Sequence, residues 1–190
     1  MRLFIAMPIP EKFRDILHGL KDTRLPVRWT PPENYHLTLR FIGEVTESRA
    51  DEIRQQLHKV EAGEPFEMVL EGLGAFPRPS RPRVIWCAAE PEQPIKTLHS
   101  RIQHTLSAVD LEPEDKPFHP HVTLGRVKQS STAIEEFLKE NESFTAGRFR
   151  VNQFCLYVSK LGKAGAVHKV VETYPFGNEL HKSVDRNEGD

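Results

Sequence analysis

The chain is poor in cysteine, has no long apolar run and carries almost no net charge. Only two of its 190 residues are cysteine, which leaves neither a disulfide framework nor a CxxC metal signature. Cys87 and Cys155 both lie in apolar, strand-like runs, so we expect two buried free thiols. No apolar stretch approaches the roughly 20 residues of a membrane helix, and residues 1–7 are too short for the core of a signal peptide. These absences predict a cytoplasmic protein that does not enter a membrane.

The formal net charge of −1 excludes a global basic field that would draw in nucleic acid. Contact with a polyanion must then come from a local cluster, which favours a small site, such as one RNA end, over a long duplex. Residues 76–83 form one such cluster, with Arg78, Arg81 and Arg83, three prolines and no acidic residue. This segment is either a stiff connector between two halves of the chain or a basic rim that contacts an RNA backbone. No glycine-rich loop of the kind that cradles ATP phosphates is present, so no nucleotide cofactor is expected.

Predicted elements occur in the same order twice. Apolar residues at helical or alternating spacing indicate strand, helix, strand, helix, strand in each half. In the first half these lie at 2–7, 11–22, 35–42, 48–61 and 66–73; in the second they lie at 83–89, 93–109, 121–127, 131–140 and 149–158. A further strand is predicted at 167–174, after a turn at 162–165. The order indicates an α+β fold in a single domain at 1–176, built from halves at about 2–75 and 83–160 and followed by a polar tail at 177–190.

The central strand of each half carries the same short pattern of histidine, apolar residue, threonine, apolar residue. The two copies are His36-Leu37-Thr38-Leu39 and His121-Val122-Thr123-Leu124. Because side chains alternate between the two faces of a strand, the histidine and threonine of each copy share one face. The apolar residues share the other face and anchor the strand to the core. A duplicated unit of this kind predicts two imidazoles that converge on one cleft.

Two imidazoles with a hydroxyl beside each can perform acid-base chemistry on a phosphate. One neutral and one protonated histidine, each with a pKa near about 6.5, can act as base and acid at neutral pH. The threonine hydroxyls can donate hydrogen bonds to phosphoryl oxygens. His119 and His121 could instead bind zinc from one strand. No third ligand of suitable spacing follows them, so we expect a site without metal.

The residues around both motifs resemble the two-histidine (2H) phosphoesterase superfamily. More narrowly, they are similar to the RNA 2′,3′-cyclic phosphodiesterases, also called 2′-5′ RNA ligase-like proteins. The resemblance rests on the runs 36–45 and 120–126, extends to the runs 3–6 and 82–86, and covers about residues 2–176. It implies a bilobal fold with pseudo-two-fold symmetry, in which antiparallel sheets face a central cleft and helices lie outside.

The same resemblance implies hydrolysis of a terminal 2′,3′-cyclic phosphate to a 2′-phosphomonoester without metal or other cofactor. It implies that His36 donates a proton to the leaving 3′ oxygen and that His121 accepts one from water. Thr38, Thr123 and Arg126 would bind the phosphate. The implied partners are RNA 3′ ends or cyclic nucleotides, and a monomer is expected. Gly125 departs from the pattern, because alanine or another small residue was expected there.

Other functions stay open at this point. Family members are also linked to 2′-5′ RNA ligation, and related enzymes act on 2′-5′ oligonucleotides or on ADP-ribose 1″,2″-cyclic phosphate. A non-catalytic module that holds a nucleotide or RNA end would carry the same residues. The motifs are common to all of these and do not separate them.

Several further side chains have two interpretations each. Arg40 is in phase with His36 and Thr38, so it either faces the same cleft or pairs with an acidic neighbour at the surface. Aromatic side chains that either stack a nucleobase or belong to the core are Trp86, Phe41 and Phe118. The remaining histidines are interpreted as surface or structural residues: His18, His58, His99, His104, His168 and His181.

Overall fold

The computed structural model describes residues 1–162 and 165–177 and confirms the α+β class. Its strands are β1 (Arg2–Pro8), β2 (Val27–Trp29), β3 (His36–Glu44), β4 (Phe66–Phe76), β5 (Val84–Glu90), β6 (His121–Val127), β7 (Thr145–Val151), β8 (Gln153–Gly162) and β9 (Gly165–Pro175). Its helices are α1 (Glu11–His18), α2 (Glu47–Leu57), α3 (Glu92–Ser107) and α4 (Thr132–Glu140), with a 3-10 turn η1 (Pro32–Asn34) before β3. Residues 178–190 of the polar tail predicted at 177–190, and residues 163–164 of the predicted turn, lie outside the described residues.

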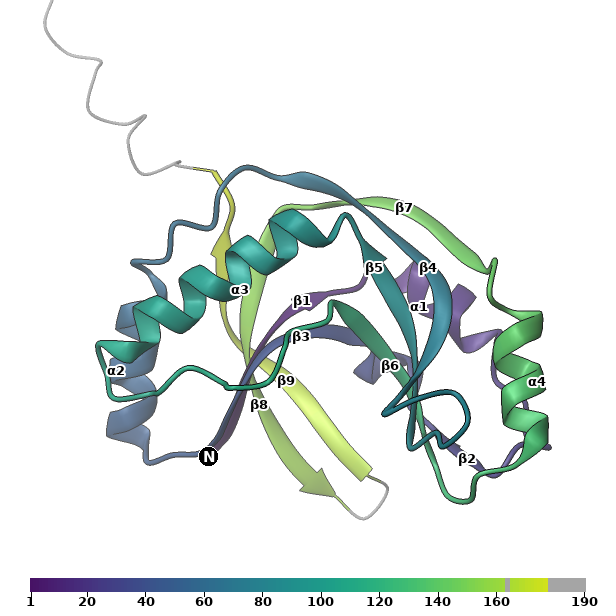
Figure 1. Ribbon diagram of the computed structural model, residues 1–190. Helices are drawn as coiled ribbons and strands as arrows, with labels where there is room; N and C mark the ends of the chain where they lie inside the picture. The colour runs from purple at the N-terminus through teal and green to yellow at the C-terminus, as the bar shows by residue number, and fades with distance from the viewer. Residues whose placement is uncertain (163–164, 178–190) are drawn as a thin grey trace, which may run out of the picture.

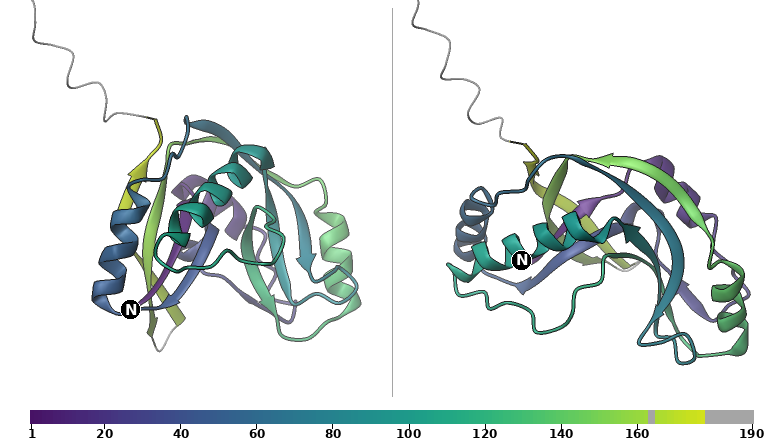
Figure 2. Two further views of the ribbon diagram at one scale, coloured as in Figure 1. Left: turned by 60° about the vertical axis from the view of Figure 1, so that its left-hand side comes forward. Right: turned by 45° about the horizontal axis from the view of Figure 1, so that its top comes forward.

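The strands form one antiparallel sheet in the order β7-β4-β5-β6-β3-β1-β8-β9, with β2 beside β6. The sheet curls into an arch, with α2 and α3 over one half and α1 and α4 over the other (Figure 1). The two further views show the same division (Figure 2). The halves β9-β8-β1-β3 and β6-β5-β4-β7 meet at a single bridged residue pair, Leu37 with Val122. The two histidine strands are therefore the seam of the molecule.

The last strand of each sequence repeat crosses to the opposite half of the sheet. β4 ends the first repeat but pairs with β5 and β7 of the second. β8 ends the second repeat but pairs with β1 of the first. Each half of the sheet is thus completed by a strand from the other half of the chain.

Four element predictions differ most from the structure, and one is the helix predicted at 48–61, which ends at Leu57 as α2. The single strand predicted at 149–158 is two strands, β7 and β8, separated at Asn152, whose carbonyl accepts a hydrogen bond from the Phe176 amide. The three-residue strand β2 lies between residues 22 and 35, where no element was predicted, and its pairing with β6 gives it order. The helix predicted at 11–22 ends at His18 as α1, because the chain turns at Gly19. Leu20 has the spacing of the helix but lies in that turn.

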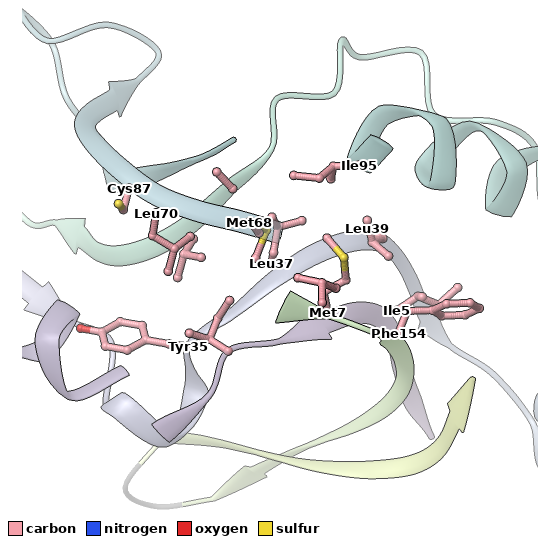
Figure 3. Packing of buried hydrophobic residues seen from close by; sticks show 14 of the residues in the cluster. Ile5, Met7, Tyr35, Leu37, Leu39, Met68, Leu70, Cys87, Ile95 and Phe154 are labelled. Carbon is pink, nitrogen blue, oxygen red and sulfur yellow. The ribbon is translucent and has the colours of Figure 1, made fainter. Parts of the chain in front are cut away.

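One face of the sheet, called here the core face, packs against the helices in a single apolar cluster. Core residues from the two halves meet directly, with Met68 and Leu70 of β4 opposite Leu37 and Met7 (Figure 3). Helix α3 contributes a buried stripe at helical spacing, made of Ile95, Leu98, Ile102 and Leu106. Each such side chain stabilises the fold by roughly 1.5–3 kcal/mol when fully buried. Helix α2 begins at an N-cap, where the Thr46 hydroxyl accepts a hydrogen bond from the Arg49 amide at 3.2 Å.

Two expectations from composition can be compared with the described residues. Cys87 and Cys155 are buried and free, which confirms the prediction of two free thiols. In the ranges 1–162 and 165–177, none of the helices combines the length and apolar character that crossing a membrane requires.

Gly125 has a packing role that explains its departure from the expected alanine. It lies on the core face, where a Cβ atom would stand 2.6 Å from Val27 Cγ1 and 3.2 Å from the Arg28 carbonyl oxygen. Strand β2 approaches β6 this closely because residue 125 has no side chain.

We predict that Gly125→Ala destabilises the protein by about 1–3 kcal/mol, since Val27 and the β2 backbone must move. Chemical denaturation followed by circular dichroism measures the change. The double variant Gly125→Ala, Val27→Ala should lose less than the sum of the two single variants, because the clash is shared. Additive losses would show that Val27 does not limit the space at residue 125.

Candidate active site

The two histidine motifs lie side by side at the seam of the sheet. Leu37 pairs with Val122 in an antiparallel bridge, and both side chains are fully buried on the core face. The alternation of an antiparallel pair then sets His36 across from Thr123 and Thr38 across from His121. All four side chains lie on the opposite face, called here the site face, and all are half-buried. Cross-strand neighbours have Cβ atoms roughly 4.5–5.5 Å apart, so two imidazoles and two hydroxyls surround one small area.

Each histidine ring is held by the same hydrogen bond. His36 Nδ1 lies 2.7 Å from the Asn34 carbonyl oxygen, and His121 Nδ1 lies 2.6 Å from the His119 carbonyl oxygen. A carbonyl only accepts, so each Nδ1 carries the hydrogen and donates it. In the neutral ring, Nε2 is then the unprotonated nitrogen, available to accept a proton. Both rings are thus fixed in one tautomer by the backbone two residues earlier.

His36 lies in an aromatic and histidine-rich environment. Its ring centroid is 4.8 Å from that of Phe4 and 6.2 Å from that of Tyr157, which stack on each other at 5.0 Å. His168 of β9 approaches edge-on, with ring centroids 5.4 Å apart. The Asn34 side chain donates to the Ala166 carbonyl at 2.7 Å and so ties β9 to the segment that holds His36.

His121 has an aromatic environment built from different residues. The rings of Phe76 and Trp86 lie 5.0 Å and 6.2 Å from its own. Trp86 has room because it faces Gly74, where a Cβ atom would stand 2.2 Å from the indole. The arginine-containing segment 77–83 leaves directly from Phe76, so it lies beside this half of the site. Its three arginines are exposed.

Burial lowers the pKa of both imidazoles. For His36 the pKa falls to about 4, because burial disfavours the charged ring and because His168 and His121 add positive charge when protonated. The hydrogen bond to Asn34 acts in the opposite direction. For His121 the pKa is also lowered, chiefly by burial, against the hydrogen bond to His119. Without substrate, both rings are therefore neutral at neutral pH.

A β-bulge occurs at the same place in both motifs. Ile5 and Ala6 pair with Arg40 and Thr38, and Ile85 and Trp86 pair with Gly125 and Thr123. The third and fourth residues after each histidine therefore both lie on the core face. The fifth residue returns to the site face: this is Phe41 in the first motif and Arg126 in the second. Strict alternation would have placed both on the core face.

The bulge overturns both interpretations of Arg40. Its side chain neither faces the cleft nor pairs with a surface acid, but is buried, with 5% exposure. It donates a hydrogen bond to the Glu112 carbonyl, in the segment that follows α3. Burial lowers the pKa of this guanidinium. Arg40 is thus a structural residue on the core face.

The other candidate side chains are either exposed on the site face or packed against a neighbouring ring. Phe41 is 60% exposed on the site face, and its ring lies 6.0 Å from that of Phe4. Phe118 stacks on His99 at 4.0 Å, which accounts for its ring without a base. His168 was expected to be a surface or structural residue, but it contacts His36.

In the ranges 1–162 and 165–177, no three histidine, cysteine or acidic side chains gather as a metal site would require.

Sequence reasoning missed the residues that position the histidines. Asn34 and His119 act through their backbone carbonyls, which no residue preference marks. Both stand two residues before a histidine, at the entry to its strand, and that shared spacing was the available signal. Phe4, Phe76 and His168 lie on other strands, and only the pairing of the sheet brings them to the site.

We predict that the His36 imidazole of the free protein titrates near pH 4 and that His168→Gln raises this pKa, because a nearby cation is removed. Two-dimensional NMR of the histidine ring signals measures both values. His99→Gln is the matched control, since His99 stacks on Phe118 and should leave His36 unchanged. An unaltered His36 titration in His168→Gln would contradict the coupling of the two rings.

The chain is similar to known proteins over most of its length. A family model described as the 2′-5′ RNA ligase superfamily matches residues 11–163. A protein of Aeropyrum pernix named RNA 2′,3′-cyclic phosphodiesterase is 37% identical over 160 residues, which cover 80% of this chain and 88% of that protein. A protein of the same name from Thermotoga maritima is 34% identical, covering 95% of this chain and 98% of that one.

Solved structures show the same fold. The crystal structure of a Thermus thermophilus protein, TT0787, has a TM-score of 0.75 and 29% identity, and the match covers 93% of this chain and 98% of that chain. Escherichia coli LigT, solved with 3′-AMP, has a TM-score of 0.74 at 21% identity, covering 92% of this chain and 97% of that chain. With the family model matching most of its length, the chain belongs to the 2′-5′ RNA ligase superfamily, the two-histidine phosphoesterases.

Proposed function

We propose that this protein hydrolyses the terminal 2′,3′-cyclic phosphate of RNA, or of a cyclic nucleotide, to a 2′-phosphomonoester. The observation that carries the proposal is the seam of the sheet, where two histidine-threonine pairs lie side by side with both Nδ1 atoms held by backbone carbonyls. The relatives named RNA 2′,3′-cyclic phosphodiesterase, at 37% and 34% identity, support the same reaction.

The reaction needs one base and one acid on opposite sides of the phosphorus. His121 Nε2 accepts a proton from water, whose oxygen forms a bond to phosphorus. The bond from phosphorus to the 3′ oxygen breaks, and His36 Nε2 donates a proton to that leaving oxygen. The product carries a 2′-phosphate and a 3′-hydroxyl, and a proton transfer between solvent and each ring restores the starting state. No group other than the two rings and water is required for this balance.

Thr38, Thr123 and Arg126 bind the phosphate in this proposal. The hydroxyls lie beside the histidines on the site face, and the bulge in β6 turns Arg126 to the same face. A guanidinium can neutralise a phosphoryl oxygen and donate two hydrogen bonds to it. Phe41, exposed on the same face, offers an apolar surface on which a base can stack.

The low pKa of His36 limits when its ring can carry the proton that it donates. With a pKa of about 4, this ring is neutral at pH 7 before substrate binds. A cyclic phosphate carries one negative charge, and an anion beside a histidine favours the protonated ring. Substrate binding therefore raises the pKa of the His36 ring and prepares it as a proton donor.

The oligomeric state, the compartment and the partners are inferred from the same residues. All four central side chains come from one polypeptide, which supports a monomer as the active unit. Buried free thiols at Cys87 and Cys155 suit a reducing compartment such as the cytoplasm. RNA 3′ ends and cyclic nucleotides are the partners that carry the cyclic phosphate of this reaction.

We expect His36→Ala and His121→Ala each to lower turnover of a 2′,3′-cyclic mononucleotide by roughly 10²–10⁴-fold, because each ring moves one proton in the transition state. Product analysis by chromatography, with EDTA present, measures the rate and identifies the phosphomonoester. His104→Ala, on the exposed face of α3, is the control and should retain wild-type turnover. Full activity in either active-site variant, or loss of wild-type activity in EDTA, would contradict the mechanism. Binding without product would favour a non-catalytic module.

The pH dependence should reveal both histidines. We expect a bell-shaped profile of kcat/KM with both limbs below about 6.5, since burial lowers the pKa of each ring in the free protein. The limbs of kcat should lie at higher pH, because the bound anion favours protonated rings. Steady-state rates across the acidic and neutral range, into mildly alkaline pH, measure both curves. A flat profile would argue against two titrating imidazoles.

A further inference from the structure

Two arginines face each other beside the site. Arg28 of β2 pairs directly with Arg126 of β6 across an antiparallel strand pair, and both are exposed. Among the residues described, no carboxylate lies within 4.0 Å of either guanidinium. Like charges directly opposite one another destabilise a sheet. An anion bound between them would remove this repulsion.

Both guanidinium groups belong to the site face. The neighbours of Arg28 on its strand, Val27 and Trp29, belong to the apolar cluster on the core face, so the residue between them points the other way. Arg126 also points to the site face, because its chain neighbours Gly125 and Val127 lie against the core. The pair therefore shares a face with His121 and Thr123.

Along β6, the arginine pair lies after His121 and Thr123. One edge of β6 is bordered first by β3, at Val122, and then by β2, at residues 125–127. Thr123 and Arg126 are three residues apart with a bulge between them, which is roughly 7–10 Å along the strand. Arg126 thus lies next to the position where the cyclic phosphate would bind, and Arg28 lies one strand beyond it.

More positive charge borders the pair, and the short runs 26–30, 82–85 and 125–129 contain no acidic residue. The Val127 amide donates to the Arg83 carbonyl at 2.9 Å, and the Lys128 amide donates to the Pro26 carbonyl at 2.8 Å. Arg83 and Lys128 are both exposed. The end of β6 is consequently a local basic patch on a chain whose net charge is −1.

We propose that Arg28 forms a second phosphate subsite that binds the internucleotide phosphodiester next to the cyclic end of an RNA strand, with Arg126 between this phosphodiester and the cyclic phosphate. The inference rests on the proposed function and extends it to the substrate class. A cyclic mononucleotide has no such phosphodiester, whereas an oligoribonucleotide with a cyclic end has one. The arrangement therefore selects RNA ends over free cyclic nucleotides.

The test compares two substrates in the full-length protein. We expect the ratio of kcat/KM for a short oligoribonucleotide 2′,3′-cyclic phosphate to that for a 2′,3′-cyclic mononucleotide to exceed one in the wild type. In Arg28→Ala this ratio should fall about tenfold, the effect of one lost charge-assisted hydrogen bond to phosphate. The slope of log kcat/KM against log salt for the oligomer should become shallower by about 0.7.

Two further variants make the outcome decisive. Arg28→Lys keeps the charge and should restore most of the ratio. Arg24→Ala removes a cation from the same segment, but one already paired with Asp22 at 2.7 Å, and should leave the ratio unchanged. An unaltered ratio and salt slope in Arg28→Ala, with the fold intact by circular dichroism, would overturn the subsite. Absence of turnover of both substrates by the wild type would instead overturn the proposed function, so the two failures are distinguishable.

Discussion

The bridge between Leu37 and Val122 is the contact on which the site depends. It is the single bridged pair between the two halves of the sheet within the described residues, and it fixes the register of the histidine strands. A shift of one residue would turn one histidine and one threonine toward the core. Both side chains of the bridge are fully buried, so the apolar core selects this register. Packing on one face of the sheet thereby places both histidines on the other.

The two histidines are alike in how they are held and different in what surrounds them. Each donates Nδ1–H to the carbonyl two residues earlier, and each contacts aromatic rings. Only His36 also meets another histidine ring edge-on, at His168. Both rings therefore hold the same tautomer, and burial, together with the neighbouring His168, lowers the pKa of His36.

The sequence predicted the parts of this structure that depend on local pattern. The alternation within each motif placed the histidine and threonine on one face, and the apolar spacing predicted helix α3 and the order of the elements. Arg40 shows where this reasoning fails. A single extra residue in the strand reverses the face of everything after it, and nothing in the local sequence marks the bulge. His168 shows a second limit, since its contact with His36 depends on which strands pair across the whole sheet.

The position five residues after each histidine shows how the duplicated halves have diverged. Both copies keep the bulge, so the side chain at this position returns to the site face in each. One copy carries the apolar ring of Phe41 and the other the guanidinium of Arg126. A symmetrical frame thus presents dissimilar chemistry at its two ends, which suits a ligand with an aromatic base and an anionic backbone.

The exchange of β4 and β8 between the halves bears on how the chain reaches its native state. A polypeptide containing only the first repeat would expose the edge of β1 that β8 normally occupies, and its own β4 would lack β5. The second repeat alone would have the complementary defect. Neither repeat is therefore self-sufficient in the present molecule, and unfolding of one half removes a strand from the other. Cooperativity between the lobes is built into the connectivity of the backbone, independently of any side chain at their junction.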